Sequence, residues 1–480
     1  MQAYRKVGAA VACIALASAP AIPVSASPLS ANRRFILTDA SFPADKYILD
    51  QACIMVELYY RMDEEEVLVY DPEEPEVVFG KWSIRHLYQA QAEDSIVRIK
   101  RGIRRQVKAL MDAPAAEWTP EQQKLRAHFP AAWSVAQAAA SANRAVSKRG
   151  LRKAFRLSLE RAYPYQALID SAFRSQGVPT RLKHLAHIES WFNPEAVSKA
   201  GAAGIWQFLK SSGNPYMAIN DRVDQRFDPY ASTAAAARFL RRCHGQVNSW
   251  PLAIMSYNNG TGQILDAVKE TGSRNASEII QNYEAGGFGI ISRNYYAMYL
   301  AASSLAERSE KLFPGLRKRP SQSFKIVKLE HEWTPQQLRI LTGYSNAVIR
   351  RCNPALRPVV FERNLPVPEG FQLRLPAGLP TSQDLQFSDL RIGGGENGRE
   401  GEQPTRSFMA GLPIPESLAA SLHRIKAALF PERRRDDVPL MAYMHSQGLL
   451  DARRLALAKQ DNILIEPHPA LQAVIRSLGG

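Results

Sequence analysis

Cysteine is scarce in this chain, with 4 residues among 480. Cys13 lies in the first apolar segment, and the other three, Cys53, Cys243 and Cys352, are far apart in the sequence. This number and spacing exclude a disulfide framework of the kind that stabilises small secreted domains. We expect the three to be small buried core residues, although an oxidising compartment would allow one pair to form.

Acidic residues are also few relative to basic ones. The chain has 46 Asp and Glu against 61 Lys and Arg, which gives a formal net charge of +15 and a pI of about 9.6. Such a balance favours an anionic partner such as nucleic acid, anionic lipid or an acidic cell-wall polymer. No nucleic-acid-binding motif occurs in the sequence, so we expect no nucleic-acid partner. An acidic cell wall accounts for the sign of the charge.

Long hydrophobic runs are missing beyond the N-terminus, where the pattern is typical of a secretory signal peptide. Two basic residues precede an apolar segment over 7–16, and small residues at 24–26 suit cleavage. We therefore expect residues 1–26 to be removed, and the protein to be exported and either soluble or peripheral. Lipidation at Cys13 is the alternative, but the apolar segment before it is short for that purpose.

The most informative stretch runs from 184 to 208 and places one carboxylate at the end of an apolar helix. Apolar residues recur at helical spacing before Glu189, Pro194 then breaks the helix, and a glycine-containing turn over 200–204 follows. Burial disfavours the charged form of a carboxylate, so we expect the pKa of Glu189 to be raised. A glutamate with a raised pKa can deliver a proton at neutral pH. The alternative is that Glu189 is an ordinary solvated helix residue.

Residues 189–208 follow the pattern E-S-x-F-N-P-x-A-x-S-x-A-G-A-x-G-x-W-Q-F. This pattern resembles the signature of the soluble lytic transglycosylase (SLT) catalytic domain family, and in particular its membrane-bound lytic transglycosylase D type. Members of the family are lysozyme-like enzymes that cut peptidoglycan. The resemblance implies a mainly α fold, peptidoglycan strands as the partner, no cofactor, and a location in the periplasm or at the cell wall, with peripheral contact to wall or membrane.

Three downstream segments are similar to the same family. The stretch 256–262 is similar to its A-Y-N-x-G-x-G motif, with Ser256 where alanine is usual. The stretch 224–229 has its D-x-R-x-D-P pattern, for which we expect a structural role at the start of a helix capped by Asp228 or Ser232. Tyr295 matches the family's active-site tyrosine, but Ile291 and Ser292 stand where Glu and Thr are frequent, which leaves open how that end of the cleft is held.

The rest of the chain divides by composition and pattern. Residues 323–378 show the order strand, helix, helix, Asn353-Pro354, strand, which resembles a degenerate LysM-like module that binds N-acetylglucosamine chains. In the N-terminal region we expect a long amphipathic helical segment over 82–111 and a helix that starts at Thr119-Pro120, and within 323–378 a helix that starts at Thr334-Pro335. We find no chemistry in the N-terminal helices and assign no function to the C-terminal tail. The predicted domains are a signal peptide (1–26), a helical N-terminal region (27–164), a lysozyme-like catalytic domain (165–318), a LysM-like α/β module (323–378), a linker (379–407) and a short helical tail (408–480).

The resemblance also implies roles for single residues. One glutamate, Glu189, would act as acid and then as base, and its product would be a 1,6-anhydromuramic end. The predicted substrate-binding residues are Ser190 and Gln207 for positioning, Asn258 and Tyr295 for hydrogen bonds to the N-acetyl group or to Glu189, and Trp206 and Tyr257 as flat faces for sugar rings or as core.

Three alternatives belong to other classes. A hydrolytic muramidase of goose-lysozyme type would need an aspartate to orient water, for which Asp221 and Asp224 are the candidates. A non-catalytic wall-binding protein would use the same cleft without the acid chemistry. A zinc site of His184, His187 and Glu189 would lack the spacing of an H-E-x-x-H motif, so we predict no metal.

Overall fold

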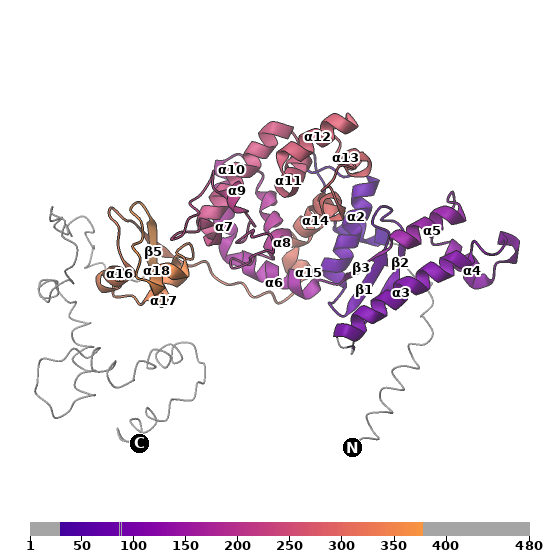
Figure 1. Ribbon diagram of the computed structural model, residues 1–480, viewed down its shortest axis with the longest axis horizontal. Helices are drawn as coiled ribbons and strands as arrows, with labels where there is room; N and C mark the ends of the chain where they lie inside the picture. Colours follow the sequence, from indigo (N-terminus) through magenta and orange to yellow (C-terminus); the bar gives the residue numbers. More distant parts are fainter. Residues whose placement is uncertain (1–28, 86, 88, 378–480) are drawn as a thin grey trace, which may run out of the picture. The chain divides into compact units, whose positions relative to one another are not determined.

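A computed structural model describes residues 29–377, except 86 and 88 (Figure 1). The described residues are mainly helical, as predicted, with two small sheets. The predicted signal peptide, linker and tail lie outside these residues. Within 29–377, none of the helices placed by the structure has both the length and the apolar character needed to cross a membrane.

The N-terminal region, defined here as residues 29–162, contains a three-stranded antiparallel sheet that we did not predict. Its order is β2-β1-β3, and the central strand pairs with both neighbours. The segment that begins at Trp82 was expected to be helical, but Trp82 lies in β2 and the helix begins at Gln89. The elements are α2 (Lys46–Val56), β1 (Glu66–Tyr70), β2 (Val78–Ser83), α3 (Gln89–Ala109), α4 (Pro120–Arg126), α5 (Val135–Arg144), β3 (Val146–Arg149) and α6 (Arg152–Ala162).

Helix α3 follows the amphipathic pattern expected from its sequence. Its apolar side, including Ile96, Ile103 and Val107, packs in one cluster with Val67 and Val69 of the central strand. Its arginines and lysines lie mostly on the exposed side. The predicted start of α4 is confirmed, because Thr119 caps it in a capping box with Gln122, which satisfies N–H groups that the first turn cannot.

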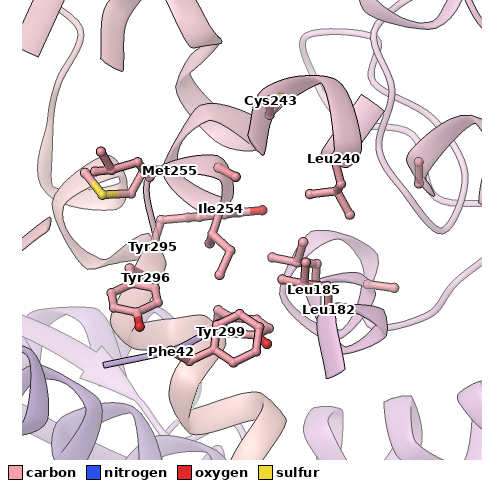
Figure 2. Packing of buried hydrophobic residues seen from close by; sticks show 14 of the residues in the cluster. Phe42, Leu182, Leu185, Leu240, Cys243, Ile254, Met255, Tyr295, Tyr296 and Tyr299 are labelled. Atoms are coloured by element: carbon pink, nitrogen blue, oxygen red, sulfur yellow. The ribbon is translucent and has the colours of Figure 1, made fainter. Parts of the chain in front are cut away.

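The central region, defined as residues 163–313, is built from helices around one apolar core. Figure 2 shows Leu182, Leu185, Leu240, Ile254 and Tyr299 in this core. The helices are α7 (Gln166–Ser175), α8 (Leu185–Ser190), α9 (Lys210–Gly213), α10 (Pro229–Val247), α11 (Trp250–Asn259), α12 (Thr261–Thr271), α13 (Ala276–Asn282), α14 (Ile290–Ala306) and α15 (Ser309–Leu312).

The N-terminal and central regions share this core. Phe42 belongs to it, and its ring lies 5.4 Å from that of Tyr299. Tyr296 donates a hydrogen bond to the carbonyl of Pro43 at 2.7 Å, and α2 packs on α14 (Figure 1). The predicted boundary near residue 164 therefore separates segments that pack against each other in one core.

The C-terminal module, defined as residues 324–376, has the predicted order of elements with one added helix. It consists of β4 (Phe324–Lys328), α16 (Pro335–Thr342), α17 (Asn346–Cys352), α18 (Pro358–Glu362) and β5 (Gln372–Pro376), and the two strands pair antiparallel. The buried Asn353 exchanges hydrogen bonds with the backbone of Arg374, both at 2.8 Å, and so ties α17 to β5. The likeness to LysM stays a prediction.

The three cysteines in the described part of the chain are buried and free. This confirms the prediction that they are core residues.

Candidate active site

Glu189 lies in the last turn of α8, where the backbone makes an unusual exit. Trp191 and Phe192 follow with φ values of 55° and 53°. Bulky residues rarely adopt this left-handed conformation, and each instance costs of the order of 1–3 kcal/mol. Phe192 is buried in the core and the indole of Trp191 meets Tyr59 edge to face at 5.8 Å, so packing holds the strained turn beside the carboxylate.

Glu189 is half-buried as a residue, and the surroundings of its carboxyl group favour the protonated form. Burial raises its pKa from 4.5 to about 7, and a hydrogen bond from the Tyr295 hydroxyl opposes this rise. Tyr295, on α14, is itself buried, and burial together with the nearby Glu189 raises its own pKa well above 10. The tyrosine is therefore a neutral donor at physiological pH. The raised pKa of Glu189 that the sequence led us to expect is present.

Ser190 is buried and its hydroxyl is used within the protein. It donates to the carbonyl of Ile205 at 2.9 Å and accepts from the backbone N–H of Asn193 at 3.2 Å. These bonds join the end of α8 to the turn at 201–208. Ser190 therefore fixes the end of α8 to this turn.

The turn at 201–208 is held closely against the segment that contains Arg226. Gly204 has a φ of 76°, and a Cβ there would lie 1.8 Å from the carbonyl oxygen of Arg226, so only glycine fits. Gln207 also has a positive φ, 49°, and its side-chain amide donates to the carbonyls of Gly204 and Ala196. The Gln207 side chain is therefore tied into its own turn.

The aromatic candidates divide between the two roles considered for them. Trp206 is fully buried, and its indole N–H donates to Thr233 Oγ1 at 2.9 Å, so its ring belongs to the core. Tyr257 is half-buried and donates to the carbonyl of Trp206 at 2.8 Å, which brings α11 to the same turn. Asn258, next on α11, is exposed.

The end of the site that the sequence left open is closed by a neutral pair. Ser292 donates a hydrogen bond to Asn259 Oδ1 at 2.5 Å, and Asn259 also donates to the carbonyl of Met255. Ile291, which stands where an acid is frequent in the family, is 66% exposed. The connection from α11 to α14 therefore needs no carboxylate here.

The aspartates considered for a hydrolytic mechanism are engaged elsewhere. Asp224 is buried in an ion pair with Arg226 at 2.8 Å. The side chain of Asp221 is fully exposed, 3.9 Å from Arg357. Asp228, one of the two residues predicted to cap α10, does so by accepting a hydrogen bond from the N–H of Tyr230.

The two histidines of the zinc alternative are also engaged. His184 Nε2 lies 2.8 Å from Glu307 Oε1, and His187 Nδ1 lies 2.8 Å from Ser158 Oγ. Burial lowers the pKa of both imidazoles. The described residues contain no group of three or more His, Cys, Asp or Glu side chains placed to hold a metal ion.

Two supports of this site did not follow from the sequence. Arg226 donates to the carbonyls of Gly201 and Phe208 at 2.7 and 3.1 Å, and its place in the D-x-R-x-D-P pattern was the available signal. Tyr59, from the N-terminal region, contacts Trp191, and no local pattern indicated this contact.

Part of the sequence that forms this site is similar to known proteins. The family model "Transglycosylase SLT domain" matches residues 167–280. Membrane-bound lytic murein transglycosylase D of Escherichia coli (strain K12) is 37% identical over 119 residues, which are 24% of this chain and 26% of that protein. Membrane-bound lytic murein transglycosylase F of Marinobacter nauticus is 31% identical over 112 residues, 22% of this chain and 21% of that one.

Among solved structures, the 70 kDa soluble lytic transglycosylase of Escherichia coli aligns with 15% identity and a TM-score of 0.27, over 49% of this chain and 38% of that one. The chain spans about a quarter of the length of the first curated relatives it matches. The match to the family model includes Glu189, Gln207, Tyr257 and Asn258, and ends before Tyr295. Residues 167–280 are therefore similar to a transglycosylase SLT domain, the family that the sequence motifs resemble.

Proposed function

We propose that this protein is a lytic transglycosylase that cleaves the bond between N-acetylmuramic acid and N-acetylglucosamine in peptidoglycan without consuming water. The observation that carries this proposal is Glu189, in an SLT domain, with a pKa raised to about 7 and a neutral tyrosine as its hydrogen-bond partner. A group that must give and then take a proton works best when its pKa lies near the working pH.

The proposed reaction uses Glu189 twice. The protonated carboxyl gives its proton to the glycosidic oxygen, and the bond from that oxygen to C1 of the muramic residue breaks. The N-acetyl carbonyl of the same sugar stabilises the positive charge at C1. The carboxylate then takes the proton of the C6 hydroxyl as its oxygen bonds to C1, which forms the 1,6-anhydro ring and restores the acid. No metal or cofactor takes part in these steps.

Tyr295 stabilises the carboxylate that the first step of this cycle produces. Its hydroxyl donates to Glu189, and a hydrogen bond to a carboxylate stabilises the charged form. Burial favours the protonated form needed at the start. Because these two effects oppose each other, both the protonated and the charged form of Glu189 are accessible. This supports Glu189 as acid and then as base.

The other predicted residues have more limited proposed roles. Asn258, because it is exposed on α11 and can donate and accept, remains a candidate for the N-acetyl group. Ser190, Gln207 and Tyr257 hold the site through protein contacts. Trp206 is proposed as core, since its ring is fully buried. The substrate implies an exported protein that works in the periplasm or at the cell wall.

The hydrolytic alternative receives less support. A goose-type muramidase needs a carboxylate that orients water, and retaining or inverting glycosidases use a second acid within about 10 Å. Asp224 is held in an ion pair with Arg226, and the pKa of Glu189 is raised by burial. Asp221 and Asp224, the candidates for this role, lie instead near Arg357 and Arg226, which favours structural roles for them.

Mass spectrometry of the muropeptides released from purified peptidoglycan tests the proposal. The wild type is expected to release anhydromuramic ends, and Glu189→Gln none. Glu195→Gln, the same chemical change at an exposed position in the same segment, is the matched control and is expected to act as the wild type does. Reducing ends with added water would instead establish a hydrolase. Binding without products from any variant would identify a wall-binding protein.

A further inference from the structure

A loop of the central region, residues 220–228, forms part of the C-terminal module's fold. We call it the bridging loop. Val223, 2% exposed, belongs to the module's apolar cluster and forms a β-bridge with Leu356. On either side, Asp224 N–H donates to the carbonyl of Ala355 at 2.8 Å and Arg357 N–H to that of Arg222 at 3.0 Å. All these residues lie in one compact unit of the chain.

A buried ion pair closes the same contact. Arg374, on β5, lies 2.5 Å from Asp228 Oδ2, and the two side chains are 7% and 5% exposed. The guanidinium also lies over the ring of Tyr230, 4.3 Å from its centroid. Because Asp228 is the N-cap of α10, one carboxylate joins the module to the start of a central helix. A buried pair of this kind leaves an uncompensated charge when one partner is removed.

The opposite face of the bridging loop holds the turn beside Glu189. Arg226, anchored by Asp224, donates to the carbonyls of Gly201 and Phe208, and its own carbonyl fills the space that the missing side chain of Gly204 leaves. Within the turn at 201–208, the carbonyl of Ile205 accepts a hydrogen bond from the Ser190 hydroxyl. Contacts thus run without interruption from the module to the residue that follows Glu189.

We propose that the C-terminal module is a fixed part of the scaffold of this site, and that Arg374 is a positioning residue that acts on the turn at 201–208 through the bridging loop. The module's own hydrophobic cluster is incomplete without Val223, and the loop's buried carboxylate Asp228 is unpaired without Arg374. Each therefore requires the other to keep its folded geometry. The expected effect on turnover rests on the proposed function, whereas the structural coupling is independent of it.

Hydrogen exchange on the full chain tests the coupling without substrate. In Arg374→Met we expect the amides of Ala203 and Gln207, which are hydrogen-bonded within the turn, to exchange at least about tenfold faster. Leu68, in the sheet of the N-terminal region, is expected to stay unchanged. Arg350→Met, the same change at an exposed arginine of the module, is the matched control and should leave all three as in the wild type.

A second variant decides the test if Arg374→Met does not fold. Arg374→Lys keeps the charge but loses the planar fork, so we expect a smaller rise in exchange at the same two amides. Exchange at Ala203 and Gln207 equal to the wild type in a folded Arg374 variant would overturn the proposal. Loss of protection in β5 alone, with the turn unchanged, would overturn it as well.

Kinetics on soluble glycan strands separate positioning from substrate binding. We expect Arg374→Met to lower kcat about tenfold, with KM changed less than twofold and with partial recovery in Arg374→Lys. A raised KM with unchanged kcat would assign the module to glycan binding and overturn the positioning role. An inactive wild type would defeat the proposed function, while hydrogen exchange would still decide the coupling.

Discussion

Carboxylates in two regions of this molecule have different kinds of partner. In the bridging loop, Asp224 and Asp228 each face an arginine within 2.8 Å. At the end of α8, Glu189 accepts a hydrogen bond from the neutral hydroxyl of Tyr295, and its pKa is raised to about 7. The two ion-paired carboxylates serve structure, whereas the raised pKa of Glu189 keeps both of its charge states accessible near neutral pH. The partner, more than the depth of burial, separates the two roles.

The largest expected effect comes from removing the unpaired acid. Glu189→Gln keeps the shape and the hydrogen bond from Tyr295 but cannot exchange a proton. We expect the rate of anhydromuramic product release to fall about 10³-fold or more, since general acid and base catalysis by one group contributes about 10²–10⁴. Initial rates on purified peptidoglycan measure this, with circular dichroism to check folding. A residual rate within tenfold of the wild type would contradict the assignment.

Removing the partner of a paired carboxylate is expected to act on stability. Arg226→Met leaves Asp224 buried and unpaired and deprives the turn at 201–208 of two hydrogen bonds. We expect a loss of about 3–5 kcal/mol in the free energy of unfolding, measured in urea. The double variant with Asp224→Asn should recover part of it. A loss below about 0.5 kcal/mol, the usual range of surface changes, would show that the pair is not structural.

The pH dependence of stability sharpens the comparison further. Because the pKa of Glu189 is higher in the folded state, that state binds more protons between pH 4.5 and about 7. The wild type should therefore lose up to about 3 kcal/mol relative to Glu189→Gln as the pH rises through this window. The difference in unfolding free energy between the wild type and Glu189→Gln measures this loss. His184 and His187, whose lowered pKa values change stability with the opposite sign, contribute equally to both proteins, so their effect drops out of the difference. A constant difference from pH 4 to 8 would show that the pKa is unshifted.

The smallest predicted effect concerns the neutral donor. Tyr295→Phe removes a hydrogen bond that lowers the pKa of Glu189, so that pKa should rise by about one unit. The rate depends on the protonated acid, so the alkaline fall of kcat/KM should move to higher pH by the same amount. The pH–rate profile checks this, and Tyr283→Phe, at a tyrosine on another element, is the matched control. A shift to lower pH would contradict the role given to the hydroxyl.

Much of the fold was predictable where the signal is local. Thr119, Asp228 and Thr334 mark helix starts through capping, and all three caps are present. Strands β4 and β5 followed from alternation and bounding turns. The sheet of the N-terminal region was missed because β3 is short and polar and pairs with a strand more than 70 residues away in the chain. Pairing between strands so far apart depends on how both strands pack, and neither strand has a local sequence pattern that indicates it.

The site shows the same division. By itself the sequence determined that one glutamate stands at the end of an apolar helix, before a proline and a glycine turn, and that Tyr257 and Tyr295 belong to its motifs. Only the tertiary structure decided which groups face one another: Tyr295 rather than an arginine at Glu189, and Arg374 rather than solvent at Asp228. The reason is physical. Helical period and turn residues act over a few positions, whereas burial and charge pairing depend on segments that folding alone brings together.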